Sequence, residues 1–265
     1  MKGSFDITVL CSLLQLARLH CSAFFTKARS YLPIGLWGLV LYMMHQGPPP
    51  NIVQGYAALL LYLFVVMVWF SYAFLSSFDM VTEHLLILRI NSRFLYAISK
   101  ILFLVAVSLA AGIVGSLVPV VIEAAAWITN TAYMPYGIRV SDFFSGVFLH
   151  FIVGNLGVAA AFLFHPNPSK ENEIVLIASL FLFTVLALVK HQFFNLQGHL
   201  RYILYVFTPV YEIISLFSGS YTFTAGDLAL SAAKGGIYFI IAVAVGCYLY
   251  NKRVYGPLLA ATPRK

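Results

Sequence analysis

The amino-acid sequence predicts an all-α integral membrane protein that crosses the bilayer six times. Of its 265 residues, 61% are hydrophobic and only 9% are charged, and the mean hydropathy is +0.90. A soluble domain carries about 25% charged residues, so this chain has too little charge to cover its surface for water. Several apolar stretches exceed the roughly 20 residues that a helix needs to cross a bilayer, and their continuity excludes the alternating strands of an outer-membrane barrel.

Residues 8–29 are expected to form an N-terminal helix that lies in the membrane interface. Polar residues recur there at steps of three or four, which is the pattern of a helix with one narrow polar stripe. These residues are Thr8, Ser12, Gln15, Arg18, Ser22, Thr26 and Arg29. Such a helix lies in the plane of the interface, and a first spanning helix is the alternative.

Six apolar segments follow as spans, at about 31–46, 52–75, 98–123, 143–165, 174–192 and 229–250. Two stretches separate them clearly, "QGPPPN" at 46–51 and "HPNPSKENE" at 165–173. Proline does not continue a helix, and the charges of the second stretch need water. The whole chain, residues 1–265, is therefore expected to be a single transmembrane domain.

The distribution of Lys and Arg orients these spans. Most of the sixteen lie in the N-terminal segment, the 76–97 loop, the 166–173 loop and the C-terminal tail, which six spans place on one side. Positive residues mark the cytoplasmic side, so both termini are expected in the cytoplasm of a multi-pass plasma-membrane protein. Because most of the positive charge behind the net +7 lies in these segments and marks the cytoplasmic side, no nucleic-acid partner is expected.

The apolar segment 202–223 is expected to be a re-entrant helical hairpin in the outer leaflet. It is short, and Pro209 and Glu212 interrupt it. A seventh span here would place the basic tail motifs "NKR" and "PRK" outside, against the positive-inside rule. Non-helical backbone is tolerated at membrane depth where protein or water covers it.

The stretch "TEHLLILRINSRFLYAISKIL" at 82–102 is unusually polar for this chain. It falls in the cytoplasmic connection after the second span, which is long enough for a short surface helix at 79–95. We expect Leu85, Leu86, Leu88 and Ile90 to face the protein. The charged positions Glu83, His84, Arg89 and Arg93 are then exposed. A solvated loop that anchors the membrane side and a docking helix for a cytoplasmic partner both fit this pattern.

Four features of this stretch resemble the permease subunits of type 2 ABC exporters: Glu83, Leu85-Leu86, Ser92-Arg93, and Lys100 seven residues beyond the arginine. The layout of an interfacial helix, six spans, cytoplasmic ends and a re-entrant hairpin before the last span is similar over the full chain. The family's usual Arg-Glu-x-Gly-Thr opening is absent, since "FDMVTE" stands there, and so is its proline before the Ser-Arg pair.

The resemblance implies that the 79–95 segment is a coupling helix seated on a separate ATP-binding subunit. The contact residues it implies are Glu83, His84, Arg89, Asn91, Ser92 and Arg93. ATP and Mg²⁺ would be bound by that partner, and two permease chains would pair as a homodimer or a related heterodimer in membrane lipid. This chain would have no cofactor of its own and would not be an enzyme by itself, and it lacks a G-x-x-x-x-G-K-[ST] phosphate loop.

The cargo expected from this reading is a hydrophobic or amphipathic peptide, lipid or drug, exported from the cytoplasm or the inner leaflet. Short outer loops and the lack of charge at predicted midplanes favour it. Aromatic residues gather in the outer segment, and Tyr205, Phe207 and Tyr211 could line an exit for such a molecule. Interfacial anchoring is the alternative role of these side chains.

Two other functions remain open from the residues alone. An ion- or proton-coupled carrier needs polar groups inside the membrane, for which Asn155 and His150 are available, whereas Glu123 lies near a span end. A haem-binding electron-transfer protein could use His150 and His191 as two imidazole ligands.

Small residues four apart, such as Gly112 with Ser116, allow close helix approach within one chain or between two chains. The three cysteines have no metal-binding spacing, and no metal site is expected.

Overall fold

The structure is a computed structural model of the 265-residue chain. It describes residues 15–27, 30–47, 49, 51–78, 80–90, 92–129, 137–164, 173–189 and 207–261, with the backbone alone at 80, 173 and 250–261. Within these ranges the regular elements are all helices, and no strand occurs. The predicted all-α class is therefore confirmed for the described part of the chain.

Eight helices have defined bounds, and residues 15–25 are helical as well. They are α2 (Tyr31–Met44), α3 (Ile52–Leu75), α4 (Met80–Ile90), α5 (Arg93–Ile128), α6 (Val140–Leu163), α7 (Glu173–Val189), α9 (Val210–Phe217) and α10 (Ala225–Ala261). Residues 8–14 of the expected interfacial helix lie outside the described ranges.

Four helices are long and apolar enough to cross a membrane: α3, α5, α6 and the Ala225–Leu249 part of α10. The chain is therefore a helical, multi-pass membrane protein. The helices α2 and α7 are also apolar and lie at two further expected spans, but each is shorter than the roughly 20 residues of a full crossing. With a rise of 1.5 Å per residue, the 36 residues of α5 extend for about 54 Å, which exceeds the roughly 30 Å of hydrocarbon in a bilayer.

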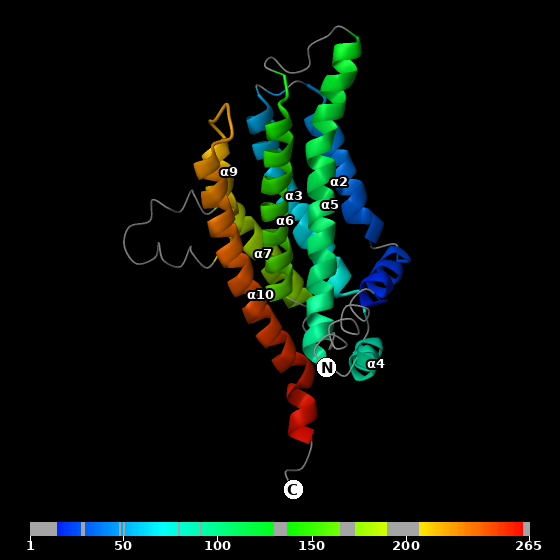
Figure 1. The fold of residues 1–265 in the computed structure, drawn as a ribbon. Helices are drawn as coiled ribbons and strands as arrows, with labels where there is room; N and C mark the ends of the chain where they lie inside the picture. Colours follow the sequence, from blue (N-terminus) through cyan, green and yellow to red (C-terminus); the bar gives the residue numbers. More distant parts are fainter. Residues whose placement is uncertain are drawn as a thin grey trace, which may run out of the picture.

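The long helices lie side by side, with α6 in the middle, packed against α3, α5 and α10 (Figure 1). The helices α3, α6 and α10 run in one direction, and α2 and α5 run in the other (Figure 1). As a result, the helical residues 15–25 and the last turns of α10 lie at the same end. Figure 1 shows α4 almost end-on at this end, so α4 runs across the foot of the long helices.

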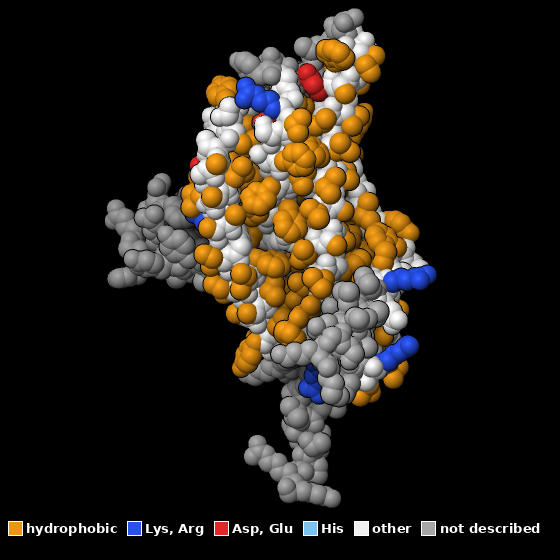
Figure 2. Space-filling view, viewed as in Figure 1, with side chains coloured by type: hydrophobic (Ala, Val, Ile, Leu, Met, Phe, Trp, Pro, Cys, Tyr) orange, Lys and Arg blue, Asp and Glu red, His pale blue; other side chains and the backbone are white. Residues whose placement is uncertain are grey.

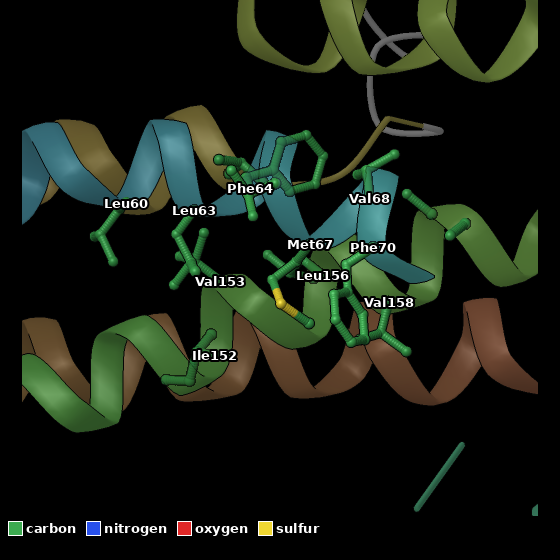
Figure 3. Close-up of a cluster of buried hydrophobic side chains, with 14 of the residues drawn as sticks. Leu60, Leu63, Phe64, Met67, Val68, Phe70, Ile152, Val153, Leu156 and Val158 are labelled. Atoms are coloured by element: carbon green, nitrogen blue, oxygen red, sulfur yellow. The ribbon is translucent and has the colours of Figure 1, made fainter. Parts of the chain in front are cut away.

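The centre of the core is the contact between α3 and α6 (Figure 3). Side chains such as Leu63 and Met67 of α3 interdigitate there with Val153 and Leu156 of α6, and all four are buried. A glycine permits this approach, because a Cβ at Gly157 would lie 2.9 Å from both the Met67 side chain and the Phe64 carbonyl oxygen. Bilayer lipid is itself apolar, so close packing of this kind is what holds membrane helices together.

The small residues of α5 serve packing within this chain. Gly112 faces the backbone of α6, and a Cβ at Gly115 would lie 2.9 Å from the ring of Trp37 in α2. The hydroxyl of Tyr56 donates to the Ser116 carbonyl oxygen over 2.9 Å. Of the two alternatives for these small residues, packing inside one chain is the one observed at Gly112 and Gly115.

Helix α4 ends earlier than the expected 79–95 segment. It stops at Ile90, and Ser92 then caps α5, its hydroxyl accepting a hydrogen bond from the Leu95 amide over 3.3 Å. Serine is a favoured N-cap because its oxygen satisfies an amide that has no partner inside the helix. Residues 93–95 therefore belong to α5, and the helix of the third expected span begins at Arg93 instead of 98.

The surface divides into an apolar middle and charged ends (Figure 2). Hydrophobic side chains cover the middle of the visible face, and Lys and Arg appear toward the ends (Figure 2). The exposed residues Arg18, Lys27, Arg89 and Arg93 belong to segments at the α4 end, whereas Arg139 precedes α6 at the opposite end. The apolar middle matches the hydrocarbon that a membrane supplies.

The described part of the expected re-entrant segment is a single short helix. Helix α9 follows Pro209 and packs through the buried residues Val210, Ile213 and Phe217, mainly against α3. It lies beside the first turns of α10, at the end opposite α4 (Figure 1). Residues 202–206 lie outside the described ranges.

Candidate functional site

Helix α4 is apolar on both faces. Its inner face carries Glu83, Ile87 and Ile90, and Ile87 packs with Leu16 and Tyr96. Its outer face carries Val81, Leu85 and Leu88, which are 66%, 62% and 74% exposed. We call these three residues the α4 stripe. Their spacing of four and then three residues places them on one side of the helix.

The expected orientation of α4 was wrong in two respects. Leu85 and Leu88 were expected to face the protein, but they are exposed on the stripe with Val81. Glu83 was expected to be exposed, but it is buried. The physical reason is the position of these residues around the helix. Glu83 lies on the same face as Ile87 and Ile90, which pack against the protein, and a cation on α5 neutralises its charge there.

That cation is Lys100 of α5. The Lys100 ammonium group donates a hydrogen bond to the Glu83 carboxylate, and both side chains are almost fully buried. Lys100 Nζ also lies 4.8 Å from the ring centroid of Tyr96 and 5.4 Å from that of Phe78, which follows α3. Aromatic faces attract cations, so these rings stabilise the charge of Lys100 in a position that water does not reach.

His20 approaches the same turn of α5 from the N-terminal helix. Its Nε2 lies 2.9 Å from Ser99 Oγ, and the Ser99 hydroxyl itself donates to the Tyr96 carbonyl oxygen over 2.7 Å. Because that carbonyl can only accept, Nε2 of His20 carries the proton and donates it to Ser99. The rings of Phe74, Phe78, Tyr96 and Phe103 surround the imidazole.

The surroundings of His20 favour its neutral form. The unprotonated Nδ1 is buried and has no hydrogen-bond partner among the described residues. Burial, and secondarily the charge of Lys100, lowers the pKa of His20 from 6.5 to about 4. Desolvation disfavours the imidazolium, and a nearby like charge adds to that effect. At neutral pH the N-terminal helix is thus held against α5 by an uncharged histidine.

A second contact binds the N-terminal helix to the turn after α3. The Lys27 ammonium group donates to the carbonyl oxygen of Ser77. We call the turn of α5 from Tyr96 to Lys100 the α5 foot. The N-terminal helix, the residues after α3 and helix α4 all meet at this foot, which lies at the end where Figure 1 shows α4.

The other residues expected at the coupling helix are dispersed. Arg89 and Arg93 are exposed, and His84 is half-buried. Ser92 caps α5, so its side chain serves the fold locally. Asn91 lies outside the described residues. The structure therefore brings together Glu83 and Lys100, and it leaves the two arginines on the surface, Arg89 on α4 and Arg93 at the start of α5.

The expected exit lining is only partly described. Tyr205 lies outside the described residues. The ring of Phe207 packs against Phe183 of α7, with centroids 5.1 Å apart, and Tyr211 is half-buried on α9. Phe207 thus packs against another helix of the protein, and part of the Tyr211 side chain is exposed on the surface.

His150, a residue of the two alternative functions, is enclosed in the bundle. Its Nδ1 lies 2.7 Å from the Gly146 carbonyl oxygen, so Nδ1 carries the proton, and Ser116 Oγ lies 3.3 Å away. The unprotonated Nε2 is buried against Gly115 and has no partner among the described residues. A haem would need this nitrogen to turn out of that contact. His191 lies outside the described residues.

Residue type and spacing missed two members of the site. His20 sits among small and apolar residues of the N-terminal helix, and its partner Ser99 is 79 positions away. Lys100 belongs to the motif, but the motif places it only at the start of the third span. The available signal was the burial of a charge: a lysine eight residues into an apolar helix needs an anion, and Glu83 is the nearest acidic residue before it in the sequence.

Comparison of the chain with protein-family models, with curated proteins and with solved structures finds no match. Among the described residues there is no group of three or more His, Cys, Asp or Glu side chains that could hold a metal ion.

Proposed function

We propose that this chain is the transmembrane subunit of an ATP-driven exporter, and that α4 seats on a separate ATP-binding subunit. The observation that carries the proposal is the α4 stripe. Three large apolar side chains stand exposed on a short helix that crosses the foot of the bundle, instead of lying along it among the spanning helices.

The stripe has the form of an anchor for a partner's groove. Helices that dock in grooves present apolar residues at i, i+4 and i+7, which is the spacing of Val81, Leu85 and Leu88. Arg89 lies exposed beside the stripe, as the polar rim of a protein interface requires. Phe94 at the start of α5 is a further exposed apolar side chain, 67% accessible.

The rest of the proposal follows from this assignment. The partner binds ATP and Mg²⁺, and two permease chains, identical or related, pair in the membrane. The α4 end and both termini face the cytoplasm, because the exposed Lys and Arg residues of the described segments favour that side. The cargo is a hydrophobic or amphipathic molecule, and the half-buried Tyr211 is the described residue of the outer end that would meet it.

The test is the double substitution Leu85→Asp with Leu88→Asp. Insertion should be unchanged, because it depends on the long apolar helices, whereas the charges would be desolvated in a groove that the stripe fills. The ATP-binding subunit should therefore be lost from the detergent-purified complex. A matched control is Val140→Asp, which also places a carboxylate at an exposed apolar position, but at the opposite end.

Two results would contradict the proposal. If no ATP-hydrolysing subunit copurifies with the wild-type chain from its own cells, the proposed function is refuted. A double variant that retains this subunit at wild-type yield and activity would show that the stripe is not its docking surface. Retention of membrane lipid alone on the stripe would instead identify α4 as an interfacial helix.

A further inference from the structure

Two of the segments that meet the α5 foot use different residues of that turn. The N-terminal helix reaches Ser99 through His20, and helix α4 reaches Lys100 through Glu83. The aromatic ring of Phe78 lies against the same ammonium group. The position of the foot is consequently tied to the position of α4.

The two ways in which α4 contacts its neighbours differ in kind. Ile87 packs on Leu16 and Tyr96 through apolar contacts, which have no preferred direction and permit sliding. The Glu83–Lys100 pair is a charge-assisted hydrogen bond in a place from which water is excluded, where such a bond is strong and directional. When α4 moves, Ile87 can therefore slide over Leu16 and Tyr96, whereas Glu83 pulls Lys100 with it.

Lys100 belongs to a helix that runs to the other end of the molecule. Helix α5 continues from the foot to Ile128, and it packs closely on α6 at Gly112. The helix is continuous through Pro119, which removes one of its backbone hydrogen bonds, so a displacement of its first turns can be passed along its length. The foot of α5 is thus connected mechanically to the end that carries Trp127.

We propose that the Glu83–Lys100 pair is the link through which a movement of α4 is passed to α5, with the two residues acting as positioning residues. The inference rests on the proposed function, in which the ATP-binding subunit supplies the movement of α4. It assigns to Glu83 a role inside the chain instead of a contact with the partner.

The first measurement needs no partner. Spin labels at Arg89→Cys and Leu102→Cys, both exposed positions, report the distance between α4 and α5 in the full chain in lipid nanodiscs, with Cys11, Cys21 and Cys247 changed to serine. We expect one narrow distance distribution that widens in Glu83→Gln and in Lys100→Gln. It should narrow again in the exchange Glu83→Lys with Lys100→Glu. An unchanged distribution in both single variants would overturn the link.

The second measurement uses the complex with its ATP-binding subunit. Labels at Trp127→Cys and Tyr221→Cys lie exposed at the end opposite α4. A non-hydrolysable ATP analogue should shift their distance in the wild type, and Glu83→Gln should abolish the shift while the subunit stays bound. The exchange variant should recover it. The matched control is Glu123→Gln, the same change near the other end of α5, which should leave the shift intact.

The outcomes separate the two proposals. If no ATP-binding subunit binds the wild type, the proposed function fails, and the first measurement still decides whether the pair couples α4 to α5. If the subunit binds and the ATP-dependent shift persists in Glu83→Gln, the proposed function stands and the link is refuted.

Discussion

At the scale of single residues, three buried polar side chains define the end of the molecule at which α4 lies. Lys100, Glu83 and His20 are removed from water, and each is stabilised by a specific neighbour. Breaking a buried ion pair by removing one partner typically costs about 3–5 kcal/mol, because the other charge stays buried without compensation. The identity of these few residues therefore decides how α4 and the N-terminal helix sit on α5.

The low pKa of His20 predicts that acid releases the N-terminal helix from α5. The pKa is about 4 when the helix is docked and 6.5 when it is free, so the free form binds the proton between these values. Docking is fully favourable above pH 6.5 and weakens as the pH falls toward 4, by up to about 3 kcal/mol. A fluorophore on Cys21, an exposed cysteine of this helix, should become more mobile over that window, with Cys11 and Cys247 replaced by serine.

The control for this pH dependence is His20→Asn, which retains an amide donor for Ser99 but does not titrate. Its fluorophore mobility should not change between pH 6.5 and 4. If the wild-type signal is also flat in this range, His20 does not govern the docking of the N-terminal helix.

At the scale of helices, glycines decide how closely α6 meets its neighbours. A side chain at Gly157 would meet the Phe64 carbonyl oxygen of α3, and backbone cannot move aside cheaply. Other glycines face open space: a Cβ at Gly38 of α2, for example, meets nothing within 4 Å among the described residues. The same residue type is thus required at one helix contact and dispensable at another.

The difference predicts opposite effects for two glycine-to-alanine changes. Gly157→Ala should destabilise the protein by about 1–3 kcal/mol, since it overpacks the contact between α3 and α6. Gly38→Ala should be neutral or slightly stabilising, because alanine favours a helix where there is space. Thermal unfolding in detergent, followed by size-exclusion chromatography, measures both. Equal midpoints for the two variants would show that the α3–α6 contact can adjust.

At the scale of the whole molecule, the alternating helices place α4 at one end and α9 at the other (Figure 1). The membrane must then lie between these ends, where the surface is hydrophobic (Figure 2). The exposed arginines near α4 favour the cytoplasm at that end. This arrangement makes the two ends distinguishable by a reagent that does not cross the membrane.

Labelling of single cysteines in intact cells tests this orientation. On a chain without native cysteines, an impermeant thiol reagent added outside should modify Trp127→Cys and Tyr221→Cys, both of which are exposed. It should not modify Arg89→Cys, which is exposed at the α4 end, until the membrane is opened. External modification at position 89 with none at position 127 would show that the protein has the opposite orientation in the membrane.

The membrane class and the approximate positions of the long helices follow from local features of the sequence. The expected 52–75 span agrees with Ile52–Leu75, because both the apolar run and the Asn51 cap that starts it are local features. Residues 143–165 and 31–46 likewise lie close to α6 and α2. The start of α5 differs from the expectation: Ser92 caps a helix that begins at Arg93, five residues before the expected span.

Which face of α4 is buried depends on contacts between residues that are distant in the sequence. The helix has two apolar faces, so periodicity alone does not distinguish Leu85 from Ile87. The choice is made by Lys100, which is 17 positions from Glu83 in the sequence, and by Leu16 of the N-terminal helix. A buried lysine requires a carboxylate next to it, and this requirement turns the Glu83 face inward and leaves the α4 stripe outside.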